Sequence, residues 1–191
     1  MDKAKFPTVT LASGQHIPIL GLGMSHHGGY SHNALLYALR NCGIRHIDTA
    51  KRYGNEAFVG KAIAESGVNR EELWITTKLW PGDYGYQNTI QACLDSCERL
   101  GLEYLDGLQH FDLYLMHWPD AHVPGKTARE IRAETWQAME DLYRRAHRYH
   151  ALLICLWAEV ASRSSVVRHF RPIHCDQLRL LNDVNKKREK T

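Results

Sequence analysis

The stretch Phe111-Asp112-Leu113-Tyr114-Leu115-Met116-His117 is apolar at almost every position apart from Asp112, and it ends in a histidine. A strand that is covered on both faces has such a continuous apolar run, whereas a half-exposed strand alternates between apolar and polar residues. Strands of this kind belong to parallel sheets that helices cover on both sides. Three earlier runs are predicted to be strands of the same sheet: Gly21–Met24, Ile44–Asp48 and Leu73–Leu79.

A helix is predicted after each of these strands. Apolar residues recur at helical spacing within Asn33–Cys42, from Asn55 to Gly67 and from Asn88 to Gly101. Asn55 and Asn88 are candidate N-caps, and Phe58 is expected on the buried face of its helix. The capping box Thr127-Ala128-Arg129-Glu130 predicts the start of the fourth helix. Four successive strand–helix units predict an α/β protein with a parallel sheet.

The spacing of these units fits a barrel. The strands end near residues 24, 48, 78 and 117, so the ends are 24, 30 and 39 residues apart. A (β/α)8 barrel of about 250 residues averages roughly 31 residues per unit. We therefore expect a TIM-type (β/α)8 barrel truncated to roughly its first four βα units. A hairpin is predicted ahead of it, with strands at Thr8–Leu11 and His16–Leu20.

Charge and glycine divide the chain near residue 143. Residues 1–143 hold 13 Lys+Arg and 17 Asp+Glu, a net charge of −4, whereas residues 144–191 hold 11 and 4, a net charge of +7. All 14 glycines lie at or before Gly125. We predict a partial barrel over 1–143 and a divergent, basic, mostly helical segment over 144–191. Within that segment Ala151–Val160 is either a helix or a buried strand, Val166–Phe170 is strand-like, and Gln177–Lys187 is a helix.

Composition also bears on compartment and partners. The N-terminus is charged, and the longest apolar stretch, Ala151–Ala158, is far shorter than the roughly 20 residues that span a bilayer. Five cysteines without disulfide spacing predict buried free thiols in a reducing cytoplasm, and Cys93 and Cys97 share one helix face without a zinc-site pattern. We expect a cytoplasmic protein with no metal, no membrane contact and no nucleic-acid partner. Nucleic-acid binding by the basic end Lys186–Lys190 is a weaker alternative.

Polar residues stand where the predicted strands end. Asp48 and Lys78 lie at the ends of the second and third strands, His117 ends the fourth, and Tyr53 lies in the loop after the second. In a parallel barrel, the loops at the carboxyl ends of the strands form the active site. Taken singly, each residue has an ordinary structural explanation, such as a cap, a surface charge or a loop contact.

Together these four residues suit the reduction of a carbonyl group. The carbonyl oxygen gains negative charge as hydride arrives, so the reaction needs a proton donor. A phenol such as Tyr53 donates more readily beside an ammonium group, which Lys78 is predicted to supply. Asp48 is predicted to pair with Lys78 and hold it in place. His117 is predicted to hydrogen-bond the carbonyl oxygen and orient it.

Two tryptophans follow these strand ends closely. Trp80 comes two residues after Lys78, and Trp118 comes directly after His117. Indole rings supply apolar walls for a small ligand, and packing in the core is the alternative for each. We predict that both indoles bind substrate.

Three ordered motifs closely resemble those of the aldo-keto reductases. They are Asp48-Thr49-Ala50-Lys51-Arg52-Tyr53-Gly54-Asn55-Glu56, Trp74-Ile75-Thr76-Thr77-Lys78-Leu79-Trp80 and Asp112-Leu113-Tyr114-Leu115-Met116-His117-Trp118-Pro119. With Gly21-Leu22-Gly23-Met24 and the preceding hairpin, the resemblance covers about residues 8–143. Members of this family are NADPH-dependent (β/α)8-barrel enzymes that reduce aldehydes and ketones.

The resemblance implies a role for each strand-end residue. Tyr53 would be the proton donor, Lys78 and Asp48 would tune it, and His117 would orient the substrate. Met24 and Asp48 would lie near the nicotinamide end of NADPH. The implied partner is a small aldehyde or ketone.

The chain departs from the family pattern in two places. Gly107–Asp112 is an apparent six-residue insertion, and a register slip of an odd number of residues there would turn His117 away from the site. Residues 144–191 hold no counterpart of the family's Ser-Asn pair, its stacking tyrosine or its Ile-Pro-Lys-Ser run, which bind the cofactor. The alternative interpretation is therefore a catalytically inactive, truncated isoform. Its exposed strand edges would associate with a second copy or with a full-length relative.

Overall fold

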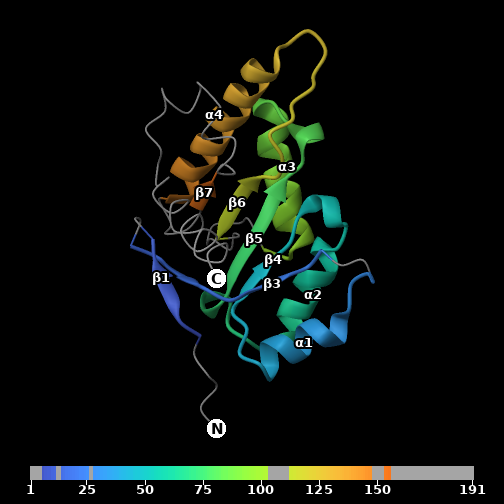
Figure 1. Ribbon diagram of the computed structural model, residues 1–191, viewed down its shortest axis with the longest axis vertical. Coiled ribbons are helices and arrows are strands. Elements are labelled where there is room, and N and C mark those ends of the chain that lie inside the picture. The colour runs from blue at the N-terminus through green and yellow to red at the C-terminus, as the bar shows by residue number, and fades with distance from the viewer. Residues whose placement is uncertain (1–5, 12–13, 26–27, 103–111, 148–152, 156–191) are drawn as a thin grey trace, which may run out of the picture.

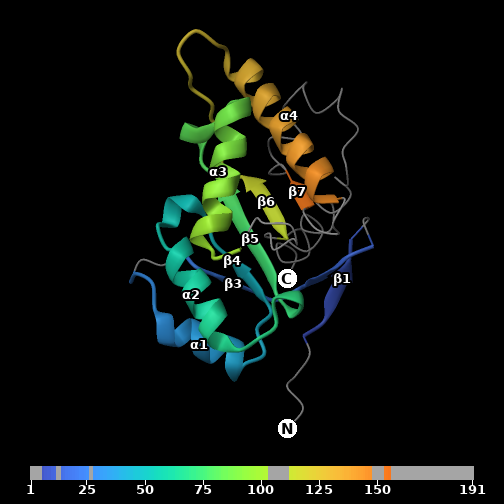
Figure 2. The same ribbon diagram turned by 180° about the vertical axis from the view of Figure 1, so that it is seen from behind.

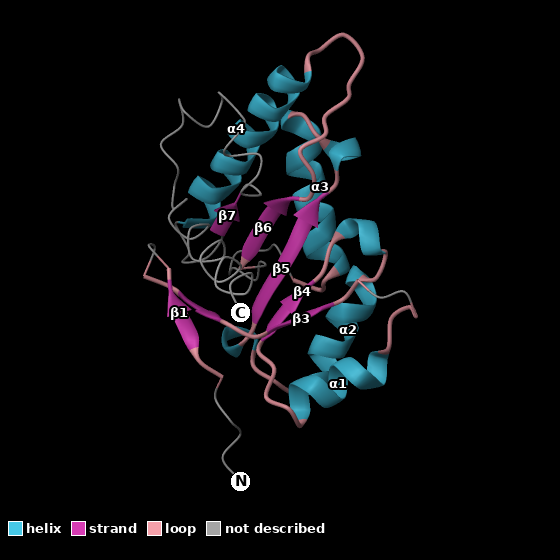
Figure 3. Ribbon diagram, in the orientation of Figure 1, coloured by secondary structure: helices cyan, strands magenta, loops and turns pink. Residues whose placement is uncertain are grey.

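The computed structural model describes residues 6–11, 14–25, 28–102, 112–147 and 153–155. Within these ranges, five strands form one parallel sheet in the order β3-β4-β5-β6-β7 (Figures 1 and 3). The strands are β3 (Gly21–Gly23), β4 (His46–Asp48), β5 (Trp74–Leu79), β6 (Leu113–Met116) and β7 (Leu153–Cys155). Their spatial order follows their order in the chain, as expected of consecutive strand–helix units.

Four helices connect or follow these strands. They are α1 (His32–Arg40), α2 (Glu56–Ser66), α3 (Tyr86–Arg99) and α4 (Ala128–His147). Each helix packs against the next one in the chain, and they lie side by side along the sheet (Figure 2). The predicted α/β architecture is confirmed over this part of the chain.

The core lies between the strands and these helices. Ile47, Ile75 and Tyr114 project from neighbouring strands and are completely buried, as is Leu39 of α1. Burial of such an aliphatic side chain contributes about 1.5–3 kcal/mol. Gly60 of α2 lies directly against the end of α3, because a Cβ there would lie 2.4 Å from the backbone oxygen of Leu100. A side chain at that position would hold α2 away from the end of α3.

A separate antiparallel hairpin precedes the sheet, as predicted. It pairs β1 (Thr8–Thr10) with β2 (His16–Pro18), and Val9 lies opposite Ile17. Leu11 and Trp74 form a small buried cluster on which Ile17 and Leu113 pack. Because Trp74 and Leu113 are the first residues of β5 and β6, the hairpin covers the amino ends of these strands and leaves their carboxyl ends clear.

Parallel pairing aligns those carboxyl ends. Gly23 lies opposite Asp48, Asp48 opposite Thr76, and Lys78 opposite Leu115. The loops that follow β3, β4, β5 and β6 therefore gather at one edge of the sheet. No helix within the described ranges has both the length and the apolar character needed to cross a membrane.

Several helix boundaries differ from the sequence expectation. The prediction that Asn88 caps the third helix is wrong, because α3 begins at Tyr86, after Gly85. The first helix begins one residue early, at His32, with Ser31 as its cap. The fourth helix begins as predicted: Thr127 Oγ1 accepts from the Glu130 amide, and the Thr127 amide donates to Glu130 Oε2 at 2.8 Å.

Burial corrects two further expectations. Phe58 was expected on the buried face of α2, but it is 56% exposed, because the helix turns that position toward the carboxyl ends of the strands. Cys42 is an exposed free thiol, whereas Cys93 and Cys97 are free and buried in α3 as predicted.

The last two strands of the sheet differ from the sequence expectation in length or were left open by it. The run 111–117 contributes four residues to β6, so the strand is shorter than predicted. Of the two alternatives for 151–160, the structure has a strand, β7, which pairs in parallel with β6. The strand predicted at 166–170 and the helix predicted at 177–187 lie outside the described residues.

Candidate active site

A cleft of about 530 Å³ opens at the carboxyl edge of the sheet. Its walls come from the loops after four consecutive strands, as expected of a site in a parallel α/β fold. The described residues that line it are Met24, Ser25, Gly29, Tyr30, Arg52, Tyr53, Gly54, Asn55, Phe58, Trp80, His117 and Trp118.

The ammonium of Lys78 ties the end of β5 to the end of β4 and to the loop that follows β4, beside this cleft. Its Nζ donates to Oδ1 of Asp48 at 2.5 Å, to the backbone oxygen of Thr49 at 2.9 Å and to the hydroxyl of Tyr53 at 3.3 Å. The Lys78 side chain is 12% exposed and that of Asp48 is 34% exposed. A partly buried charge is stable only when it is paired and hydrogen-bonded. The arrangement therefore holds a compensated positive charge next to a phenol.

Local backbone structure places Tyr53. It ends the 3₁₀ turn η1 (Lys51–Tyr53), and its amide donates to the oxygen of Ala50 at 3.0 Å. Gly54 follows with a φ of 68°, a left-handed conformation that stops the turn and suits glycine. The turn directs the Tyr53 side chain back over the end of β5, where Lys78 lies.

His117 is the first residue after β6, and its amide continues the ladder by donating to Leu79 at 3.0 Å. Its ring meets those of Tyr53 and Trp80 edge-on, with centroids 5.5 and 5.7 Å away, and stacks on Trp118 at 5.9 Å. The insertion before β6 therefore leaves the strand in a register that turns His117 toward Tyr53.

Burial lowers the pKa of His117 below its ordinary value of 6.5, and the charges of Lys78 and Arg52 lower it further. The carboxylate of Asp48 acts in the opposite direction but does not prevail. The imidazole is therefore neutral at pH 7. Its Nδ1 is buried without a hydrogen-bond partner among the described residues, which leaves capacity for a ligand group.

Asn55 has a role that the sequence interpretation missed. It occupies the N-cap position of α2 but makes no side-chain cap bond. Instead its Nδ2 donates to the backbone oxygen of Met24 at 2.8 Å, and its Oδ1 accepts from the hydroxyl of Thr49 at 2.7 Å. The buried amide thus ties the loop after β3 to the loop after β4. An asparagine beside a helix start signals a cap, so this longer-range role had no separate sequence signal.

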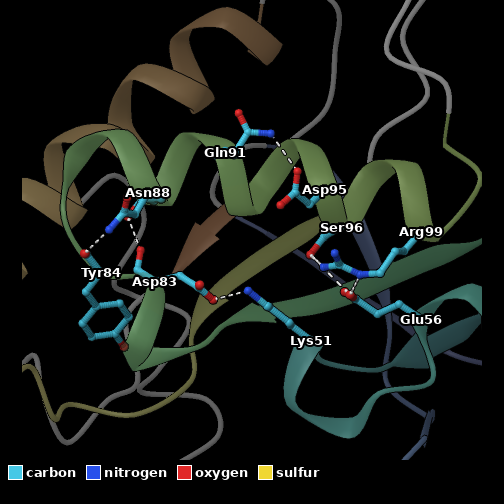
Figure 4. Close-up of polar contacts among 10 residues, drawn as sticks. Lys51, Glu56, Asp83, Tyr84, Asn88, Gln91, Asp95, Ser96 and Arg99 are labelled. Atoms are coloured by element: carbon cyan, nitrogen blue, oxygen red, sulfur yellow. Dashed lines mark hydrogen bonds and ion pairs between the residues drawn. The ribbon is translucent and has the colours of Figure 1, made fainter.

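Two ion pairs fix the elements around the cleft (Figure 4). Glu56 is almost completely buried, and its carboxylate accepts from Thr77 at 2.6 Å and from Nε of Arg99 at 2.8 Å. It therefore connects α2 with β5 and α3. Lys51 of η1 pairs with Asp83 of the 3₁₀ turn η3 (Pro81–Asp83) at 2.7 Å. Neither pair has a signal in the sequence, because the partners are far apart along the chain.

The two predicted wall residues both line the cleft. Trp80 lies beneath the guanidinium of Arg52, whose Cζ is 5.3 Å from the ring centroid. Trp118 is 45% exposed, and its backbone oxygen accepts a hydrogen bond from the hydroxyl of Tyr84. Met24 also lines the cleft but is almost fully buried. The structure thus brings every predicted site residue to the same edge of the sheet.

The family model for the aldo/keto reductase family matches residues 20–145. The chain belongs to this family. A glyoxal reductase from Bacillus subtilis is 43% identical over 139 residues, which are 72% of this chain and 45% of that protein. A 9,11-endoperoxide prostaglandin H2 reductase from Trypanosoma cruzi is 40% identical over 172 residues, which are 89% of this chain and 50% of that protein.

Solved structures of aldo/keto reductases are similar in fold. An enzyme from Brucella melitensis superposes with a TM-score of 0.71 at 34% identity, over 95% of this chain and 70% of that one. An enzyme from Bombyx mori in complex with NADP has a TM-score of 0.67 at 33% identity, over 85% of this chain and 56% of that one. These matches confirm the expected partial barrel. The chain spans about half the length of the curated relatives it matches.

Proposed function

We propose that this aldo/keto reductase uses NADPH to reduce aldehydes or ketones to alcohols, with Tyr53 as the proton donor. The observation that carries the proposal is the position of Lys78, whose ammonium reaches both the Asp48 carboxylate and the Tyr53 hydroxyl at the rim of the cleft. Oxidoreductases among the relatives and a related structure in complex with NADP support the reaction class.

The residues around Met24 fit the nicotinamide end of the cofactor. Met24, Trp80 and Trp118 offer apolar and aromatic surface, and the buried Nδ1 of His117 has unused hydrogen-bonding capacity. Met24 and Asp48 would lie beside the bound ring, and the two indoles would flank the substrate. When bound there, NADPH supplies the hydride.

Tyr53 would complete the reaction by moving one proton. The carbonyl carbon receives hydride, and the carbonyl oxygen then takes the proton of the Tyr53 hydroxyl. The phenolate that remains is stabilised by the Lys78 ammonium 3.3 Å away, and a proton from solvent restores it. Asp48 keeps the ammonium in position and balances its charge.

His117 would orient the substrate. A neutral imidazole can donate one hydrogen bond to the carbonyl oxygen without supplying a competing acid. Burial and the nearby cations keep His117 in this neutral form. Because the rings of His117 and Tyr53 are in edge-on contact, the imidazole and the phenol hydroxyl would both reach the carbonyl oxygen of the substrate. We assign this chemistry to residues 1–143, with the basic segment 144–191 outside it.

The test is NADPH consumption by the purified full chain with an aromatic aldehyde. We expect turnover that falls roughly 10²–10⁴-fold in Tyr53→Phe, because that variant keeps the ring but lacks the proton. Tyr37→Phe is the matched control, since Tyr37 lies on α1 and is 61% exposed. Unchanged turnover in Tyr53→Phe would refute the role of Tyr53. Absence of turnover, together with large soluble assemblies, would favour the associating, inactive isoform.

A further inference from the structure

Arg52 is the one charged side chain among the described residues that line the cleft. It is the middle residue of η1, next to Tyr53, and its side chain is exposed. The other members of the lining are neutral, including His117, whose pKa is lowered. A ligand that enters the cleft therefore meets a single guanidinium against otherwise uncharged walls.

The neighbouring charges already have partners. Lys78 is paired with Asp48. Lys51, directly before Arg52, is paired with Asp83, as Figure 4 shows. Arg52 has no ion pair within the described part of the chain. An uncompensated guanidinium that stays next to a cleft is available to an anion from solution.

An aromatic contact holds this cation in place. The guanidinium carbon of Arg52 lies 5.3 Å from the centroid of the Trp80 ring, within the range of a cation–π contact. The same indole meets the ring of His117 edge-on at 5.7 Å. Trp80 thus connects the cation with the imidazole beside the proposed reaction centre.

The remaining rim of the cleft is aromatic and open to solvent. Phe58 is 56% exposed and Trp118 is 45% exposed, although both are large apolar side chains. Tyr30 stacks on Phe58 with ring centroids 5.6 Å apart, so these two rings form one surface. Exposed apolar surface at a cleft mouth is typical of sites that a ligand covers.

We propose that Arg52 selects carbonyl substrates that carry a carboxylate on an apolar or aromatic body. The guanidinium binds the carboxylate through paired N–H donors, while the rings of the rim cover the body of the molecule. The carbonyl group then points toward Tyr53 and His117. The inference rests on the proposed reductase function and names its substrate class.

The test compares 4-carboxybenzaldehyde with its methyl ester, which has the same ring and aldehyde but no charge. In the unchanged chain, we expect kcat/KM to be about tenfold higher for the acid at low salt, the scale of one charge-assisted hydrogen-bonded pair. Arg52→Gln should remove this preference, so that the ratio of kcat/KM for the acid to kcat/KM for the ester falls to about one. Arg52→Lys, which keeps the positive charge, should retain part of the preference for the acid. The preference should shrink at high salt, because Arg52 is exposed.

Arg129→Gln is the matched control, since Arg129 is an exposed arginine on α4 that does not line the cleft. It should keep the preference for the acid. Equal kcat/KM for acid and ester in the unchanged chain would overturn the inference while leaving the reductase function in place. A change in the KM of NADPH instead of the KM of the acid in Arg52→Gln would also overturn it.

A binding measurement separates this inference from the reductase function. Calorimetric titration with 4-carboxybenzaldehyde and its ester requires no hydride transfer. Tighter binding of the acid that is lost in Arg52→Gln would support Arg52 as an anion site even in a chain that reduces nothing. Equal binding of acid and ester would overturn it.

Discussion

The ammonium of Lys78 lies 2.5 Å from Oδ1 of Asp48, and the two residues come from the ends of neighbouring strands, β5 and β4. The pair has two consequences: it stabilises the alignment of the strand ends, and it leaves a third Lys78 contact for the Tyr53 hydroxyl. Lys78 therefore has both an electrostatic effect on Tyr53 and a structural effect on the strand ends. A substitution that removes the charge but keeps the aliphatic stem can separate the two effects.

Lys78→Met should reduce kcat strongly and the free energy of unfolding only moderately. The variant keeps the aliphatic stem but removes the charge that assists proton donation, so we expect a loss of roughly 10²–10⁴-fold in kcat. Removal of one partner also leaves the Asp48 carboxylate unpaired, at a cost of about 1–3 kcal/mol of the free energy of unfolding. Steady-state kinetics and urea unfolding measure the two effects. Equal kcat in Lys78→Met and the unchanged chain would exclude a catalytic role for the ammonium.

Asn55→Ala should destabilise the fold by about 1–3 kcal/mol, because it leaves the buried Met24 oxygen and the Thr49 hydroxyl without their partner. Asn88→Ala is the comparison variant. Asn88 is exposed and lies within α3, so its loss should change the free energy of unfolding by less than about 0.5 kcal/mol. Urea denaturation of both variants checks this. A loss in Asn88→Ala as large as that in Asn55→Ala would contradict the special role assigned to the Asn55 amide.

Gly60→Ala should cost about 1–3 kcal/mol, although alanine ordinarily favours a helix. The added methyl group would lie 2.4 Å from the Leu100 oxygen, and backbone cannot yield as a flexible side chain does. Gly28→Ala is the control, because a Cβ there meets nothing within 4 Å. Thermal unfolding should show a lowered Tm for Gly60→Ala alone. An unchanged Tm in Gly60→Ala would mean that α2 can move away from the end of α3 without loss of stability.

Stability should fall as pH decreases from about 7 toward 5.5. Burial lowers the pKa values of His46 and His117 below 6.5, so the unfolded chain binds more protons than the folded chain in this range. Their contribution is therefore complete above the unfolded pKa and is lost as pH falls. Asp112 has the opposite sign, because burial raises the pKa of its carboxyl group.

His46→Gln isolates one of these groups. The ring of His46 contacts the Pro18 oxygen and the Thr76 hydroxyl, and glutamine replaces it with an amide that does not titrate. Urea unfolding at several pH values should give a flatter pH dependence for the variant, even if its stability at pH 7 is lower. A slope identical to that of the unchanged chain would show that His46 titrates alike in both states.

Much of the fold and site could be predicted because the signals are local. Apolar runs located the strands, and the polar residues that end them, Asp48, Lys78 and His117, lie together once the strands pair in parallel. Their catalytic roles stay predictions. Glu56 and Arg99 could not be paired in advance, because they are far apart in sequence and meet only through the packing of α2 on α3.

Other predictions were wrong because the same local sequence signal is compatible with two different structures. Asn55 has the residue type of a helix cap, and only the nearby Met24 oxygen makes it a bridge between loops. Asn88 has the same signal, yet the helix starts before it. Phe58 fits the apolar spacing of α2, but the open cleft beside it leaves it exposed.

The most direct test of the proposed reaction follows the hydrogen itself. The purified full chain is incubated with an aromatic aldehyde and NADPH deuterated at its reactive ring carbon, and the alcohol is analysed by mass spectrometry. We predict an alcohol that carries one deuterium on the former carbonyl carbon, with its yield strongly reduced in Tyr53→Phe and retained in Tyr37→Phe. An alcohol without deuterium, or no alcohol at all, would contradict the account.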